Sequence, residues 1–188
     1  MRDRWAGLWA GSILLALGIF ARGEAIAPTR GGVLRLAQRA EPKTWNPLVA
    51  LDAPSRQVLA LLHADLITID SYTQQTTPAL AESWKRSPDG MRYTLTLRKG
   101  VRFSDGTPFT ADDVVFSWNA YVDPNVRSPQ RDLLLVGGEP IRVSKRDSHT
   151  VEFTLAKPYA AAERLFDSIA MLPRHRLAEA SKSGKLAD

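Results

Sequence analysis

The stretch from Pro78 to Trp118, PALAESWKRSPDGMRYTLTLRKGVRFSDGTPFTADDVVFSW, constrains the fold more than any other part of the chain. It contains two turn signals, Ser87-Pro88-Asp89-Gly90 and Asp105-Gly106, in which proline presets one dihedral angle and glycine accepts a positive φ. Between them, Tyr93–Arg98 alternates apolar and polar side chains, which predicts a half-buried strand. Strand, turn and helix signals this close together predict a mixed α/β fold.

The helix in this stretch is predicted to begin after Thr110. Thr110 and Asp113 have the spacing of a capping box, and acidic residues in a first turn are favoured by the helix dipole. Asp112 and Asp113 also resemble a catalytic pair of carboxylates, but neighbouring helical residues point about 100° apart, so capping is the better interpretation. Trp118 lies on the apolar face of this helix and is predicted to be core, and Asp123-Pro124 is predicted to end the helix.

The N-terminus has the layout of an export signal. Arg2 and Arg4 precede an uncharged, apolar run from Trp5 to Ala21, which is slightly short for a transmembrane helix. We therefore expect residues 1–27 to be a signal peptide, cleaved after Ala27 or at an earlier small residue, or else an uncleaved N-terminal anchor. Both alternatives place the rest of the chain outside the cytoplasm.

The remaining segments supply further elements. Val33, Leu34 and Leu36 predict a short strand. Asp52 is a candidate N-cap for a helix with Pro54 in its first turn. That helix is expected to bury a wide apolar stripe formed by Val58, Leu59, Leu61, Leu62 and Leu66. Later patterns predict a short strand at 67–69, a hairpin that pairs Ile141 and Val143 with Val151, Phe153 and Leu155, and a short helix from Pro158.

Composition and motifs exclude several classes of function. The chain has no cysteine, which excludes disulfides and thiolate metal sites. Its net charge is +5, but the basic residues are scattered, which argues against nucleic-acid binding. His63, His149 and His175 lie too far apart in sequence to suggest a metal site, and no nucleophile, phosphate-binding or dinucleotide motif is present. We therefore predict no enzymatic activity and no cofactor.

Two further tryptophans remain ambiguous. Trp84 is expected to begin a strand and to lie in the core. Trp45 lies in a loop bounded by Pro42 and Pro47, where no periodicity requires an aromatic residue. Because aromatic side chains supply contact area both to cores and to ligand clefts, Trp45 is either a core residue or a ligand contact.

The segments Pro78–Trp84, Pro88–Gly90, Tyr93–Lys99 and Phe103–Trp118 resemble family 5 extracellular solute-binding proteins, the periplasmic peptide-, dipeptide- and nickel-binding components of ABC importers. Weaker similarity continues at Thr44–Pro47 and at Ile169–Leu177. The resemblance implies a receptor whose two lobes close on a ligand and deliver it to a membrane permease.

The resemblance also implies a domain plan. Residues 28–77 would begin lobe I, residues 78–157 would form the family's extra small α/β domain, and residues 158–188 would return to lobe I. The family's second lobe, which builds most of the cleft, has no counterpart in the 188 residues. The chain is therefore expected to be an N-terminal fragment of such a receptor. A truncated gene, a split gene with a separately encoded C-terminal half, or a sequence that is a piece of a longer chain would each account for it.

Ligand contacts are expected by the same resemblance in two segments. They are the loop before the first helix, with Leu51, Asp52 and Ala53, and the segment after the capped helix, with Arg131 and Leu133. Asp52 has the alternative interpretation of a helix cap, and Arg131 that of a surface charge. Trp45 completes the candidate ligand-binding set, and no catalytic or metal-binding residue is proposed.

The predicted function is thus that of a solute-binding subunit, for oligopeptides or a related small solute, in an ABC import system. Its predicted partners are the solute, the ABC permease and, if the gene is split, a separately encoded C-terminal half, with no nucleic acid. The alternative is a secreted or membrane-tethered interaction module without a transport function.

Overall fold

The computed structural model describes residues 31–33 and 35–187, and the chain divides into two units, Met1–Leu36 and Ala37–Asp188. The predicted export segment, residues 1–27, lies outside the described residues. In the first unit, the predicted strand at Val33–Leu36 is wrong for the residues described there. They form no regular structure, and the side chains of Val33 and Leu36 are exposed. Among the described residues, no strand lies beside Val33 and Leu36 to supply backbone hydrogen bonds.

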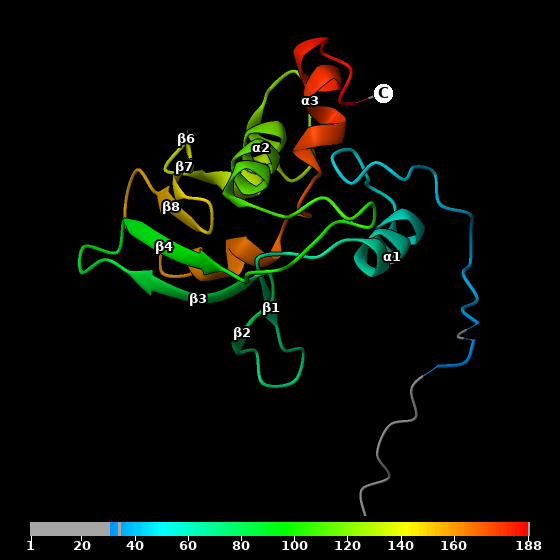
Figure 1. Ribbon diagram of the computed structural model, residues 1–188, viewed down its shortest axis with the longest axis horizontal. Helices are drawn as coiled ribbons and strands as arrows, with labels where there is room; N and C mark the ends of the chain where they lie inside the picture. The colour runs from blue at the N-terminus through cyan, green and yellow to red at the C-terminus, as the bar shows by residue number, and fades with distance from the viewer. Residues whose placement is uncertain (1–30, 34, 188) are drawn as a thin grey trace, which may run out of the picture. The chain divides into compact units, whose positions relative to one another are not determined.

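The second unit is built on a four-stranded antiparallel sheet with the order β3-β4-β8-β7 (Figure 1). Its strands are β3 (Ala81–Arg86), β4 (Arg92–Leu97), β7 (Arg142–Asp147) and β8 (Thr150–Thr154). The predicted hairpin is confirmed, with Val143 opposite Phe153 in the register. In β4 the predicted alternation is also confirmed, because Tyr93, Leu95 and Leu97 are buried on one face.

Helix α2 (Ala111–Val122) covers the buried face of the β7–β8 part of this sheet (Figure 1). The predicted capping box is present: Asp113 Oδ2 accepts hydrogen bonds from the backbone N–H of Thr110 at 2.9 Å and from its hydroxyl at 3.2 Å. The core position predicted for Trp118 is confirmed, since the side chain is fully buried and its ring centroid lies 4.7 Å from that of Phe153. The indole N–H donates to the carbonyl of Ile141 at 2.9 Å, so the buried donor is satisfied.

Shorter elements surround this layer pair. They are α1 (Ala53–Leu62), β1 (Ile67–Ile69), β2 (Thr76–Pro78), β5 (Leu135–Val136), β6 (Glu139–Pro140), α3 (Arg174–Lys182) and the 3₁₀ helices η1 (Arg131–Leu134) and η2 (Ala162–Asp167). The strand predicted at 67–69 is confirmed and pairs with β2, whereas the helix predicted from Pro158 begins only at Ala162, as a 3₁₀ helix. One cluster of buried side chains runs from Leu48 to Leu186. The boundaries predicted near residues 78 and 157 remain predictions.

Helix α1 departs from its prediction. Its N-cap is confirmed, because the side chain of Asp52 accepts a hydrogen bond from the backbone N–H of Ser55 at 3.0 Å. The wide buried stripe is wrong as a feature of the helix: Leu59 is buried, but Leu61 and Leu62 are 67% and 62% exposed. Leu66 is buried as predicted, although it lies beyond the end of α1. The reason is that α1 contacts the rest of the unit along a narrow strip that contains Ser55 and Leu59, so an apolar pattern alone overstated its burial.

Trp84 also departs from its prediction. It lies in the middle of β3 rather than at its start, and it is half-buried against the edge of the core. Within the residues described by the structure, no helix has the length and apolar character needed to span a bilayer.

Candidate ligand-binding site

Two neighbouring hollows meet at Pro47 and His63. The first, called the polar hollow, has a volume of about 180 Å³ and combines apolar walls with the polar residues Arg56, Asp65 and Gln130. The second, of about 490 Å³, is mainly apolar and lies between residues 44–48 and helix α3. The two hollows bring together three segments that are distant in sequence: the loop before α1, the segment after α2 and the segment that leads into α3. Concave surfaces with apolar walls and a few polar groups are the usual setting of a ligand site.

The loop that carries Trp45 is held rigidly. The hydroxyl of Ser55 accepts the backbone N–H groups of Lys43 and Thr44 at 2.9 and 3.1 Å. The side chain of Asn46 accepts the N–H of Leu48 at 3.0 Å and donates to the carbonyl of Leu186 at 2.7 Å. These bonds fix the backbone on both sides of Trp45.

Trp45 itself is 63% exposed and lines the apolar hollow. The core interpretation of this residue is therefore wrong, whereas its interpretation as a ligand contact remains a prediction. An exposed aromatic ring on a hydrogen-bonded loop offers contact area that costs little further ordering when a ligand binds.

The other predicted contacts lie outside both hollows. Leu51 and Leu133 are 71% and 56% exposed, and Ala53 is exposed at the start of α1. Asp52 caps α1, and the hydrogen bond from Ser55 holds the pKa of its carboxyl below the usual value. Arg131 donates from Nε to the carbonyl of Val122 at 3.0 Å, so it satisfies the C-terminal end of α2. The structure thus gives Asp52 and Arg131 structural partners and brings only Trp45 to a hollow.

Several residues of the polar hollow were not predicted from the sequence. They are Arg56, His63, Asp65, Tyr121 and Gln130. Gln130 belongs to the segment after α2 that is expected to contact ligand, but only Arg131 and Leu133 of that segment were predicted as contacts. One signal was available for Asp65: it is a charged residue within the otherwise apolar run Ala64–Ile67. Charged residues enclosed by apolar neighbours are seldom buried unless they are paired or functional.

The electrostatics of the polar hollow are unusual. Burial, together with the nearby carboxylate of Asp167, raises the pKa of Asp65 to about 7. Burial likewise lowers the pKa of His63 and raises that of Tyr121, to which the charge of Asp65 contributes. The pKa of Asp167 is also raised by burial. At neutral pH the hollow therefore holds a neutral imidazole and a carboxyl near its midpoint of titration.

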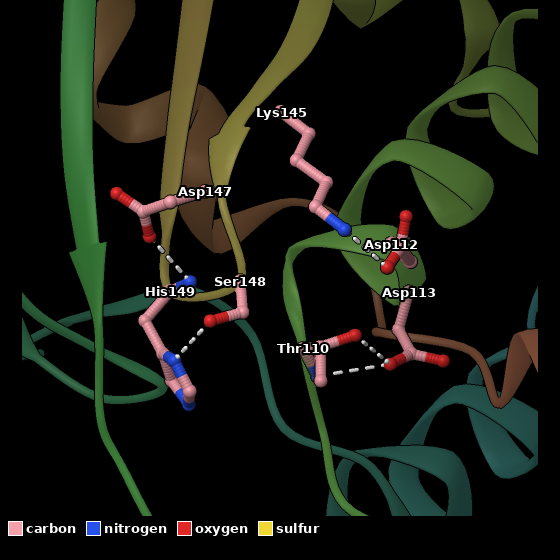
Figure 2. A network of polar contacts seen from close by, with 7 residues as sticks. All are labelled: Thr110, Asp112, Asp113, Lys145, Asp147, Ser148 and His149. Atoms are coloured by element: carbon pink, nitrogen blue, oxygen red, sulfur yellow. Dashed lines mark hydrogen bonds and ion pairs between the residues drawn. The ribbon is translucent and has the colours of Figure 1, made fainter.

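The polar contacts around the N-terminus of α2 are structural (Figure 2). Asp112 pairs with Lys145 at 2.7 Å, whereas Asp113 turns towards Thr110. Nδ1 of His149 lies 3.0 Å from the hydroxyl of Ser148, its neighbour in the same turn, and the two share a hydrogen bond. Across residues 31–33 and 35–187 no cluster of three or more His, Asp or Glu side chains has the geometry to hold a metal ion.

Comparison with known proteins agrees with the resemblance seen in the sequence. The periplasmic oligopeptide-binding protein OppA of Escherichia coli is 34% identical over 167 residues, which cover 81% of this chain and 30% of that protein. The oligopeptide-binding protein AppA of Bacillus subtilis is 30% identical over 192 aligned positions, covering 94% of this chain and 34% of that protein. The chain thus spans about a third or less of the length of these relatives.

Comparison with solved structures agrees with these sequence similarities. AppA of Bacillus subtilis in complex with a nonapeptide superposes with a TM-score of 0.68 at 29% identity, over 79% of this chain and 28% of that one. NikZ of Campylobacter jejuni in complex with Ni(L-His) superposes with a TM-score of 0.65 at 32% identity, over 79% and 28%. Residues 75–187 match the family described as bacterial extracellular solute-binding proteins, family 5, middle. The chain therefore belongs to the family 5 bacterial extracellular solute-binding proteins.

Proposed function

We propose that this chain provides one wall of the ligand site of a peptide receptor that serves an ABC importer. It binds its solute without chemical change and acts outside the cytoplasm, after export directed by residues 1–27. Its partners are a peptide or related small solute and the membrane permease that accepts the loaded receptor.

The family assignment supports this function, and the names of the relatives narrow it. OppA and AppA are both named as oligopeptide-binding proteins, and the superposed AppA structure contains a nonapeptide. The observation that carries the proposal for this chain is the rigid loop that presents Trp45 to an apolar hollow of about 490 Å³. A volume of that order accommodates several peptide side chains.

The site formed by these residues is open on one side. Trp45 lines the apolar hollow, yet more than half of its side chain is exposed to solvent. Tight binding of a small ligand requires most of its surface to leave water, which takes two walls. We propose that the second wall belongs to polypeptide beyond the described residues. It is encoded either in the same reading frame or as a separate C-terminal half.

The proposal is tested by an NMR titration of the chain with a peptide mixture. The indole N–H groups of the five tryptophans give separate signals, and a Trp45→Phe variant assigns that of Trp45. A single wall is expected to bind peptides with a Kd of roughly 1–10 mM. The signal of Trp45 should shift, whereas that of the buried Trp118 should not.

A matched control separates the site from the rest of the surface. Tyr72 is 95% exposed, lies in the turn between β1 and β2, and lines neither hollow. Trp45→Ala should weaken peptide binding at least fivefold, and Tyr72→Ala should leave it unchanged. A folded chain in which no peptide moves the Trp45 signal would contradict the proposal and favour an interaction module without a transport function.

A further inference from the structure

We propose that the polar hollow beside α1 receives a protonated amine, with the carboxylate of Asp65 as its counter-ion. The inference rests on the proposed function only in that the amine belongs to a peptide. The recognition of an alkylammonium group by the hollow is a separate claim and can be tested with small probes.

The first support is the position of Asp65 among its neighbours. Its side chain lines the hollow and forms no ion pair or hydrogen bond with any other residue that the structure describes. The one charge that acts on it appreciably is Asp167, which carries the same sign. Asp65 is half-buried, and a carboxylate that has lost part of its hydration without gaining a cation is unfavourable. A ligand cation in the hollow lowers that cost.

The second support is the shape and lining of the hollow. Its volume of about 180 Å³ exceeds that of one water molecule, which occupies about 30 Å³ in the liquid, and accommodates an ammonium group with a short alkyl stem. Leu59, Ala60 and Ala170 provide apolar walls for the stem. An ammonium group has three donors and no acceptor, and the hollow offers the oxygens of Asp65 and Tyr121.

The other charged and titratable groups around Asp65 permit a bound cation. Arg56 from α1 lines the hollow, but none of the ion pairs among the described residues joins it to Asp65. His63, at the end of α1, is neutral at pH 7 because burial lowers its pKa. Asp167 from η2 adds negative potential, and Tyr121 from α2 stays protonated because its pKa is raised. Above pH 7 the two carboxylates of Asp65 and Asp167 outnumber the one guanidinium of Arg56, so an ammonium group meets a net negative environment.

Two parts of a peptide carry this chemistry, the free amino terminus and a lysine side chain. Two pairs of tetrapeptides separate them. In one pair lysine is replaced by norleucine in an N-acetylated peptide, and in the other a free amino terminus is replaced by an acetylated one. If the hollow receives a lysine side chain, the lysine peptide should bind at least tenfold more tightly than the norleucine peptide. If it receives the amino terminus, the peptide with the free terminus should bind at least tenfold more tightly than the acetylated one.

The direct test is an NMR titration of the full chain with n-butylammonium chloride at pH 8, with n-butanol as the uncharged control. The amide signals of Asp65 and Gln130 should shift with the amine and not with the alcohol. Between pH 8 and pH 6 the affinity should fall about tenfold, because Asp65 becomes protonated and loses its charge.

Asp65→Asn removes the charge and preserves the size of the side chain. It should weaken amine binding at least tenfold, whereas Asp132→Asn, the same charge change at an exposed position, should have little effect. If Asp65→Asn does not fold, the pH profile of the wild-type chain decides: equal affinity at pH 6 and pH 8 overturns the inference. Equal binding by a folded Asp65→Asn variant overturns it too.

The outcomes for the proposed function are distinct. Butylammonium binding without any peptide binding would support the amine site and contradict the peptide receptor. Peptide binding at Trp45 that is indifferent to amines and to Asp65→Asn would support the receptor and contradict the amine site.

Discussion

The carboxylate of Asp113, in the first turn of α2, accepts the backbone N–H of Arg174 at 3.1 Å, across 61 residues of sequence. Its other oxygen accepts the N–H and hydroxyl of Thr110 (Figure 2). One side chain therefore caps one helix and fixes the start of another. Because α3 begins at Arg174 and has no buried side chain of its own, its position depends on such contacts.

Asp113→Ala should lower the free energy of unfolding by about 2–3 kcal/mol, because it leaves the Thr110 and Arg174 amides without their acceptor in a largely buried site. Asp112→Ala is the matched control. It removes an exposed pair with Lys145 and should cost less than about 1 kcal/mol. Urea denaturation of both variants measures the difference, and equal losses would show that Asp113 is only a local cap.

Ser117 is predicted to be a second residue that holds α2 to the segment leading into α3. Its buried hydroxyl donates to the carbonyl of Asp113 at 2.6 Å and accepts the N–H of Leu172 at 2.7 Å. Ser117→Ala should cost about 1–3 kcal/mol, because the buried amide of Leu172 loses its acceptor. Ser144→Ala, on the exposed side of β7, should be within about 0.5 kcal/mol of wild type in the same denaturation experiment.

Asp65 should make the chain less stable as pH rises from 4 to 7. Its pKa is about 7 in the folded chain and near 3.8 in an unfolded one, so the folded state binds more protons between these values. Stability is then lost as pH rises through this window, by on the order of 2–4 kcal/mol. Asp65→Asn should flatten this part of the melting-temperature profile and stabilise the chain at pH 8. An unchanged slope would contradict the burial of this carboxyl.

Asp105 should hold the start of α3 by its contacts with His175 at 2.7 Å and Arg176 at 3.7 Å. Hydrogen bonds from His175 and Thr107 keep the pKa of Asp105 well below its usual value. Its contribution is therefore present above the usual pKa and is lost as pH falls through the lowered one. Asp105→Asn should speed amide exchange in α3 at pH 7.

The control for that experiment is Asp89→Asn. Asp89 accepts the N–H of Met91 at 3.0 Å in its own turn, just as Asp105 accepts that of Thr107 at 3.0 Å, but it has no contact with α3. Slower or unchanged exchange of α3 in Asp105→Asn would show that the helix is held by other contacts.

Family membership and much of the α/β core could be predicted from the sequence alone. The β4 alternation, the 141–155 hairpin and the caps at Asp52 and Thr110 were all predicted and are confirmed. The candidate site was predicted less well. Trp45 lies at a hollow, but Asp52 and Arg131 have structural partners, and Asp65 was not among the predicted site residues.

Turns, caps and strand alternation depend on residues a few positions apart, so the stretch from Pro78 to Trp118 determined by itself the local structure that it adopts. The burial of Leu61, the partner of Arg131 and the enclosure of Asp65 depend on which distant segments pack together. Only the tertiary structure decided these, because an apolar pattern reports that a face can be buried but not what lies against it.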